Sequence, residues 1–344
     1  MKPVDIRSII HPPQSVGEIS TENLAMRRAA YNEGGLARGL PMYSATLDIT
    51  DPDKDGLLPV LRGEMMTIIG RPGHAKTSTM IRLSRARSQD ISTRAALGDK
   101  DAARRKVLYI SYEQTIEDLN AFHVAASLSQ EKALSITSMA MGKIDDAQWE
   151  EIEFINQRRA ADPLWFIGHS IQRPSMIRRL GTDELARVFE TVQDWQGGDS
   201  FIIDSIFIDY LQAMPYHGEK AQGVSDNLDE LKLLAKSVAR ASIVVGVQAK
   251  REVDERDDPT PQMNDGQWTS NIEQASDKVI SQIFPAKYFA QKETFGDIII
   301  NGKQQMKITV LKQKMGPAPF ARWVYFDTRY NILNDLETRR VDLN

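Results

Sequence analysis

Short apolar runs alternate with longer amphipathic segments along most of this chain. β-Rich apolar runs, expected to be strands, lie at residues 65–69, 107–113, 164–167, 205–211 and 243–248, and two or three more are expected between residues 278 and 311. Segments with helical spacing lie at residues 119–128, 183–195 and 225–240. Apolar strands that alternate with helices predict an α/β fold with a mostly parallel central sheet flanked by helices on both faces.

One strand-to-helix junction carries a phosphate-binding sequence. Directly after the run at 65–69, the chain reads Gly70, Arg71, Pro72, Gly73, His74, Ala75, Lys76, Thr77 and Ser78, and a helical pattern follows. In such a loop, backbone N–H groups and the positive end of the helix bind the phosphates of ATP. We expect Lys76 to contact the β- and γ-phosphates and the Thr77 hydroxyl to ligate Mg²⁺. The alternative is a strand–turn–helix with a chance lysine.

Ala75 is the one irregularity in this loop, because the phosphate-binding pattern has glycine at that position. Its methyl group is harmless if the φ angle of residue 75 is negative. It costs free energy if φ is positive, a region that glycine enters freely.

Three polar residues follow apolar strands at the points where ligands bind in parallel sheets. Asp209 is expected to help hold Mg²⁺, and Glu113 to orient or deprotonate the attacking water. Gln248 is expected to sense the γ-phosphate. The alternatives are an aspartate that caps a turn, a glutamate that starts a surface helix and an ordinary strand-end glutamine.

Composition limits the class of protein. The 344 residues are 41% hydrophobic and 26% charged, as in a soluble globular protein. No apolar stretch approaches the roughly 20 residues that span a bilayer, and the N-terminus has no secretory signal. Cysteine is absent, which excludes disulfides, thiolate catalysis and zinc–thiolate sites. We expect a cytoplasmic protein without a membrane partner.

The net charge of −4 means that any contact with nucleic acid is local. Arginines follow the phosphate-binding loop at 82, 85 and 87, and a basic run lies at 104–106. We expect these side chains to face solvent.

Three regions are predicted along the chain. Residues 1–40 are an N-terminal extension in which residues 20–33 form a helix, capped by Ser20 or Thr21 and ended by Gly34 and Gly35. Residues 41–335 form the ATPase motor domain, and residues 336–344 form a tail.

These motifs, in this order, resemble the RecA-like motor domain of DnaB-type replicative helicases. The resemblance covers roughly residues 40–335. It rests on the phosphate-binding loop, the strand that ends in Glu113, and the segments Ile208-Asp209-Tyr210-Leu211-Gln212, Ile272-Glu273-Gln274 and Lys312-Gln313-Lys314-Met315-Gly316-Pro317.

The resemblance implies a RecA-like P-loop ATPase with ATP and Mg²⁺ as cofactors. It implies that Glu113 is the catalytic glutamate, Asp209 the magnesium-linked acid and Gln248 a coupling residue. Lys312 and Lys314 would reach the ATP site of a neighbouring subunit.

It also implies an assembly: a homo-oligomer, expected to be a hexameric ring with single-stranded DNA in its pore, and a loader or primase as partner. The helix at 20–33 takes the position of the family's linker helix. Residues 1–40 are expected to be too short for the family's N-terminal collar domain.

The chain departs from the family pattern at two further places. Lys314 replaces an arginine finger, and lysine lacks the bidentate fork of a guanidinium. The pore-loop equivalent, residues 267–271, has lost its arginine and gained Trp268, which could stack on bases or pack in the core. Lys250 and Arg251 are the nearest basic candidates for DNA contact, although acidic residues surround them.

Three functions fit these features. The first is an ATP-driven helicase or translocase on single-stranded DNA. The second is a regulatory or scaffolding ATPase whose assembly recruits partners, which Ala75 and Lys314 favour. The third, a recombinase relative that coats single strands, is disfavoured by the 209–212 string and the 312–314 segment.

Overall fold

The computed structural model describes residues 39–49, 55–159, 161–172, 177, 180–195, 201–237, 240–269, 271–288, 294–295, 298–299 and 304–335. The predicted helix at 20–33 and the tail at 336–344 lie outside the described residues. Among these residues one large sheet contains the strands β1 (Met65–Gly70), β2 (Arg105–Thr115), β3 (Leu164–His169), β4 (Ile202–Asp209), β5 (Ser242–Gln248), β6 (Lys278–Ile283), β9 (Gln305–Gln313), β10 (Phe320–Asp327) and β11 (Ile332–Asp335).

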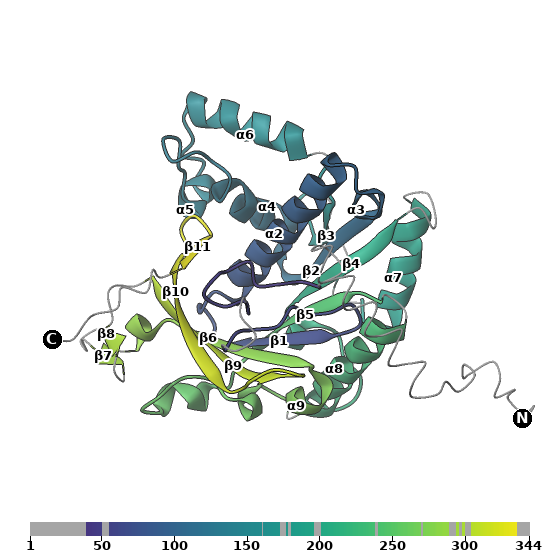
Figure 1. Ribbon diagram of the computed structural model, residues 1–344, viewed down its shortest axis with the longest axis vertical. Coiled ribbons are helices and arrows are strands. Elements are labelled where there is room, and N and C mark those ends of the chain that lie inside the picture. Colours follow the sequence, from purple (N-terminus) through teal and green to yellow (C-terminus); the bar gives the residue numbers. More distant parts are fainter. Residues whose placement is uncertain are drawn as a thin grey trace, which may run out of the picture. The chain divides into compact units, whose positions relative to one another are not determined.

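The sheet has the strand order β11-β10-β9-β6-β1-β5-β4-β2-β3 (Figure 1). From β6 to β3 every neighbouring pair is parallel. The predicted mostly parallel sheet is therefore confirmed. Gly70 pairs with Gln248 and Ser111 with Asp209, so the polar ends of β1, β5, β4 and β2 meet at one edge.

The other end of the sheet is antiparallel, which the alternating pattern did not predict. β6 pairs with β9, β9 with β10 and β10 with β11, all in antiparallel register. For β9–β10 and β10–β11 the physical reason is the short connections at 314–319 and 328–331, because only antiparallel neighbours can be joined without a long crossover. The strands β7 (Thr294–Phe295) and β8 (Ile298–Ile299) form a separate two-stranded pair.

Helices cover both faces of the sheet, as predicted. They are α2 (Lys76–Ala96), α3 (Lys100–Ala103), α4 (Ile116–Ala125), α5 (Ile136–Ala140), α6 (Asp146–Arg159), α7 (Thr182–Trp195), α8 (Lys220–Ser237) and α9 (Ile272–Ala275). Short 3₁₀ helices are η5 (Leu211–Ala213), η6 (Arg251–Glu255), η7 (Met263–Asp265) and η8 (Pro285–Lys287). Helices α2 to α4 and helices α7 and α8 lie on opposite sides of the strands (Figure 1).

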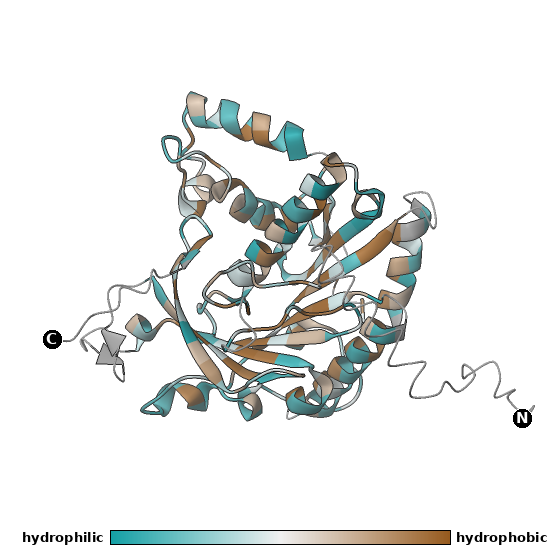
Figure 2. Cartoon of the chain, viewed as in Figure 1, coloured by the Kyte–Doolittle hydropathy of each residue, from teal (hydrophilic) through white to brown (hydrophobic). Residues whose placement is uncertain are grey.

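Alternating residues of the strands build two cores. Leu108, Ile206 and Ile243 face α7 and α8, where they pack with Leu185, Phe189 and Leu228. The other set faces α2: a Cβ atom on Gly246 would lie only 2.9 Å from Met80 Cε, so glycine allows this helix to approach β5 closely. The apolar strands and the more polar outer helices are distinguishable in Figure 2.

The arginines that follow the phosphate-binding loop are not all on the surface, and the prediction that the basic residues face solvent was wrong for three of them. Arg82, Arg87 and Arg105 are buried. Arg87 Nε lies 2.7 Å from Asp204 Oδ2, and Arg105 Nη1 lies 2.7 Å from Asp204 Oδ1. Buried charge persists where partners neutralise it, and here the partner comes from a distant strand.

Burial by itself would raise the pKa of Asp204. The charges and hydrogen bonds of Arg87 and Arg105 outweigh burial and hold that pKa below its ordinary value. This cluster ties α2 to β2 and β4 near the amino ends of the two strands.

Candidate active site

The phosphate-binding loop leaves the carboxyl end of β1 and enters α2. Gly73 has φ 76°, and Ala75, the N-cap of α2, has φ 60° and ψ 26°. Ala75 thus adopts the left-handed conformation, which costs a residue with a Cβ atom about 1–2 kcal/mol. Of the two outcomes predicted for the irregular alanine, the structure has the strained one.

Lys76 folds back over this loop. Its ammonium group donates hydrogen bonds to the carbonyls of Gly70 at 2.8 Å and Arg71 at 3.1 Å. Burial lowers the pKa of Lys76 to about 8, and the negative charges of Asp209 and Glu113 oppose that shift. One cation and two carboxylates therefore lie within electrostatic reach of one another.

Asp209, the last residue of β4, is buried beside Thr77. The Thr77 side chain hydrogen-bonds to its carboxylate, and the Tyr109 hydroxyl donates to Oδ2 at 2.9 Å. Burial raises the pKa of Asp209, and these two hydrogen bonds oppose the rise. A hydroxyl and a carboxylate are the hard oxygen donors that Mg²⁺ prefers.

Within the part of the chain that the structure describes, His, Asp and Glu side chains form no cluster of three that could hold a metal ion alone. Magnesium in nucleotide sites is bound by one or two protein groups together with phosphates and water. The pair of Thr77 and Asp209 fits that kind of site.

Glu113 lies two residues beyond Ser111, the register partner of Asp209, on the exposed part of β2. Its negative charge acts on both Asp209 and Lys76, so the three groups lie near one another. It is not at the start of a helix, since α4 begins at Ile116. Its carboxylate stands at the same edge of the sheet as Lys76 and Asp209.

Gln248 ends β5 directly beside Gly70. The side chain of Gln212 holds its backbone, and Ala249 N–H donates to the Gly70 carbonyl at 3.1 Å. The end of β5 is thus fastened to the start of the phosphate-binding loop.

Sequence reasoning missed the residues that hydrogen-bond to the backbone carbonyls of this loop. Gln282 of β6 donates to the His74 carbonyl and accepts from Thr79 Oγ1 at 3.0 Å. Lys287 donates to the Gly73 carbonyl. A signal was present, because Gln282 interrupts an apolar strand and a buried amide must be hydrogen-bonded.

Comparison with known proteins matches this arrangement to a family. Residues 55–334 match the family described as DnaB-like helicase C terminal domain. The chain belongs to this family. The resemblance seen in the motifs is confirmed.

Several replicative helicases are similar in sequence. DnaB of Helicobacter pylori strain 26695 is 27% identical over 224 residues, which are 64% of this chain and 39% of that protein. DnaB of Geobacillus stearothermophilus is 22% identical over 281 residues, covering 81% of this chain and 54% of that protein. DnaC of Bacillus subtilis is 29% identical over 137 residues, 39% of this chain and 28% of that protein.

The DnaB-like chain therefore spans about half or less of these relatives. Two solved structures share its fold. A DnaB-like replicative helicase, described with its interactions with primase, superposes with a TM-score of 0.69 at 15% identity over 95% of this chain and 68% of that one. The second, described as an ATPase domain, gives a TM-score of 0.68 at 16% identity over 94% of this chain and 100% of that one.

Lys312 and Lys314 lie away from the phosphate-binding loop, at the edge of the sheet where β1 and β6 begin. Gln313 pairs with Lys278 at the start of β6, and Lys314 N–H donates to the Asp277 carbonyl at 3.0 Å. The ammonium group of Lys312 donates to the carbonyls of Glu273 and Ser276. Lys314 is exposed. Neither lysine reaches the phosphate-binding loop of its own chain.

Trp268 is not a core residue. Its side chain is 36% exposed with φ 60°, and Lys220 Nζ lies 3.4 Å from its ring centroid. Lys250 and Arg251 are exposed on the segment that follows β5, and Lys250 Nζ donates to the Asn264 carbonyl at 3.1 Å. Their role in DNA contact stays a prediction.

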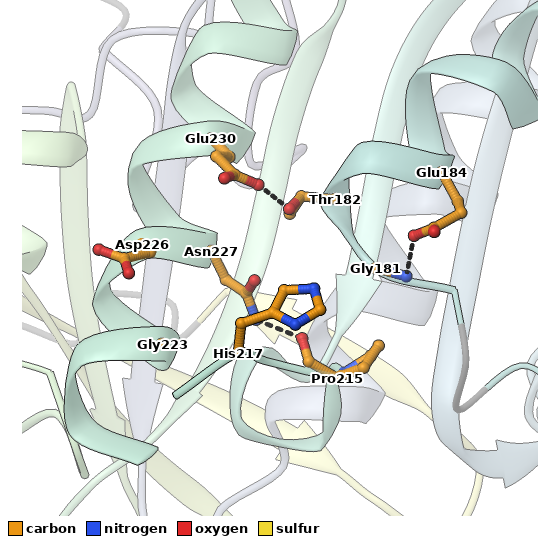
Figure 3. Close-up of a pocket in the computed structure, with 9 residues that line it drawn as sticks. All are labelled: Gly181, Thr182, Glu184, Pro215, His217, Gly223, Asp226, Asn227 and Glu230. Atoms are coloured by element: carbon orange, nitrogen blue, oxygen red, sulfur yellow. Dashed lines mark hydrogen bonds between the residues drawn. The ribbon is translucent and has the colours of Figure 1, made fainter. Parts of the chain in front are cut away.

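A separate pocket of about 200 Å³ lies between α7 and α8 (Figure 3). Its lining is Gly181, Thr182, Glu184, Pro215, His217, Gly223, Asp226, Asn227 and Glu230. Glu230 accepts from Thr182, and Glu184 from the Gly181 N–H at 2.9 Å, as Figure 3 shows. Its acidic lining is unsuited to a triphosphate.

No helix among the described residues has the length and apolar character needed to cross a membrane.

Proposed function

We propose that this chain is the ATP-hydrolysing motor of a ring-forming helicase or translocase that acts on single-stranded DNA. The observation that carries the proposal is the convergence of Lys76, Thr77, Asp209 and Glu113 at one edge of the sheet, in a member of the DnaB-like family.

Each group has a role that suits its place. Loop N–H groups and Lys76 bind the β- and γ-phosphates, while Thr77 and Asp209 hold Mg²⁺, which when bound neutralises phosphate charge. Glu113, exposed at the edge of the sheet, orients the attacking water and takes its proton. Gln248 responds to the γ-phosphate and passes its state to the segment that follows.

The position of Lys314 supports an oligomer. Phosphoryl transfer needs positive charge at the γ-phosphate. The six residues of β1 separate the loop from the edge that carries Lys314 by about 17 Å, more than a lysine side chain can span. We propose that a neighbouring subunit supplies Lys314, with Lys312 beside it, in a hexamer, and that a primase or loader is its partner.

Trp268 supports a DNA contact in the pore of that ring. An exposed indole with an ammonium group against its ring offers a stacking face and a cation for phosphate. Lys250 and Arg251 extend the same surface in the proposal.

The deciding experiment is ATP turnover with and without single-stranded DNA, together with unwinding of a forked duplex. A motor shows stimulation by DNA and strand displacement. ATP turnover that is indifferent to DNA, without displacement, would contradict the proposal. Trp268→Ala should lower DNA affinity and leave basal turnover intact.

A scaffolding ATPase is the second candidate, and the left-handed Ala75 favours it. A strained loop combined with a lysine finger suits slow hydrolysis. This function predicts nucleotide-dependent oligomers that capture a partner only when assembled, measurable by mass photometry. Unwinding by the purified protein alone would exclude it.

A further inference from the structure

Arg71, in the phosphate-binding loop, directs its guanidinium group to a segment outside the loop. Its Nε lies 3.1 and 2.9 Å from the two carboxylate oxygens of Asp254, and Nη2 lies 2.9 Å from Oδ2. Nη1 donates to the Ala249 carbonyl at 2.9 Å. Such multidentate contacts fix orientation as well as distance. The Arg71 side chain is 12% exposed and that of Asp254 37%, so the pair lies at the surface with its guanidinium side covered.

The same carboxylate is also connected to the loop through a second residue, Tyr288. The Tyr288 hydroxyl donates to Asp254 Oδ1 at 2.7 Å. The Tyr288 ring stacks on His74, with centroids 5.2 Å apart and an interplanar angle of 17°. Asp254 is thus connected to loop residues 71 and 74, on both sides of Gly73.

The His74 side chain is fixed by contacts besides the stacking on Tyr288. The side chain is buried, and its Nδ1 accepts the Phe284 N–H at 3.0 Å. Burial lowers the pKa of His74 to about 3, with Lys287 and Lys76 acting in the same direction. The ring is neutral at physiological pH, so it can accept that hydrogen bond at all times.

We propose that Asp254 is a positioning residue for nucleotide binding. It acts through Arg71 on one side and through Tyr288 and His74 on the other, and it holds the outer backbone of the loop in the conformation that receives phosphates. The inference rests on the proposed function in taking this loop as the nucleotide site.

The location of Asp254 gives this contact a further consequence. It belongs to η6, which begins with Arg251 and follows Lys250, the basic residues proposed to contact DNA. DNA bound at these two residues would act on the phosphate-binding loop through the Asp254 side chain if it displaced η6. Because binding linkage is reciprocal, nucleotide changes DNA affinity by the same factor.

The test compares Asp254→Asn with Asp257→Asn, an exposed carboxylate three residues further along the same segment. The probe is a fluorescent ATP analogue with Mg²⁺, and Kd is measured by anisotropy with and without oligo-dT. Asp254→Asn should weaken nucleotide binding about tenfold and bring the DNA-dependent ratio of Kd values towards one. Asp257→Asn should match the wild type, and the thermal midpoints should be similar.

A double-mutant cycle with Arg71→Gln separates positioning from general damage. The loss in the double variant should be smaller than the sum of the two single losses, because both changes break the contact between Arg71 and Asp254, while Asp254→Asn also changes the contact with Tyr288. Additive losses, or wild-type affinity in Asp254→Asn, overturn the inference. A wild-type protein that binds no nucleotide would instead refute the proposed function itself.

Discussion

The side-chain amide of Gln212 hydrogen-bonds to both the N–H and the carbonyl of Gln248. Its Oε1 accepts the Gln248 N–H at 3.0 Å, and its Nε2 lies 3.3 Å from the Gln248 carbonyl and 3.0 Å from that of Gln267. One buried amide thus joins the ends of β4 and β5 to the start of the loop that carries Trp268. The 209–212 string is therefore structural at its last position.

Replacing this amide is expected to destabilise the fold. Gln212→Ala leaves backbone groups without partners and should lower the free energy of unfolding by about 1–3 kcal/mol, measured by urea denaturation. Gln222→Ala is the control, because Gln222 bonds to the exposed Asp226 on the surface of α8, and it should change stability by under about 0.5 kcal/mol. Equal effects would show that Gln212 is not a structural link.

Ala75→Gly should stabilise the protein. It relieves the left-handed cost of about 1–2 kcal/mol, against about 0.5–1 kcal/mol for the greater freedom of glycine in the unfolded chain. The expected gain is about 0.5–1 kcal/mol in the free energy of unfolding. Ala86→Gly, in the interior of α2, should instead lose about 1 kcal/mol. A loss at both positions would argue against strain at residue 75.

Nucleotide affinity should fall above pH 8. Lys76 has a pKa of about 8 in the free protein, and a bound polyphosphate favours its charged form. Below pH 8 the lysine is already charged. Above it, binding takes up a proton, and affinity drops by up to about tenfold per pH unit. Titration calorimetry in buffers of different ionisation enthalpy measures that proton. Lys76→Arg stays charged, so a fall of the same slope in that variant would assign it to another group.

Asp204→Asn should be strongly destabilising at neutral pH, by up to about 3–5 kcal/mol, because Arg87 and Arg105 stay buried and keep only the more exposed Asp90 and Asp101 as counter-charges. The pKa of Asp204 is lower in the folded than in the unfolded state. Its contribution is fully present above the unfolded pKa of about 3.9 and is lost as pH falls through the folded value. The difference between wild type and variant in urea denaturation should therefore narrow below about pH 4. Asp226→Asn, at an exposed position, should show no such pH-dependent difference in the free energy of unfolding from the wild type.

Mixing two inactive variants tests the shared site. Lys76→Ala removes the loop cation, and Lys314→Ala removes the cation proposed to act on a neighbour. In a random equal mixture, about one quarter of interfaces combine an intact loop with an intact finger. ATP turnover should recover in proportion. A mixture no more active than either variant would contradict a site shared between subunits.

The order of the motifs and the type of sheet could be read from sequence because they depend on local pattern. Gly70 to Thr77 lie between a strand and a helix, and Asp209 ends an apolar run, so proximity follows from parallel topology. The bounds were less well predicted: α8 begins at Lys220 and ends at Ser237, whereas residues 225–240 were expected.

The remainder depends on contacts between distant segments. The pattern around Arg87 is that of a solvated face, whereas its buried partner Asp204 lies more than a hundred residues away in the sequence. Asp254 likewise sits in an acidic run that reads as surface, while Arg71 and Tyr288 give it partners. Side-chain pairing of this kind has no periodicity to detect.

The loop and Lys314 lie at opposite ends of β1, and this separation determines how subunits must be arranged in the proposed ring. The loop leaves β1 at Gly70, whereas Lys314 adjoins Asp277 beside the first residue of β1. In the proposed ring the loop of each subunit meets Lys314 of the next, so the contact is head-to-tail. Such contacts close into a ring or continue as a helix, and an open end leaves one loop without a donor. Turnover per subunit should then rise with the length of the assembly and reach a plateau only at closure.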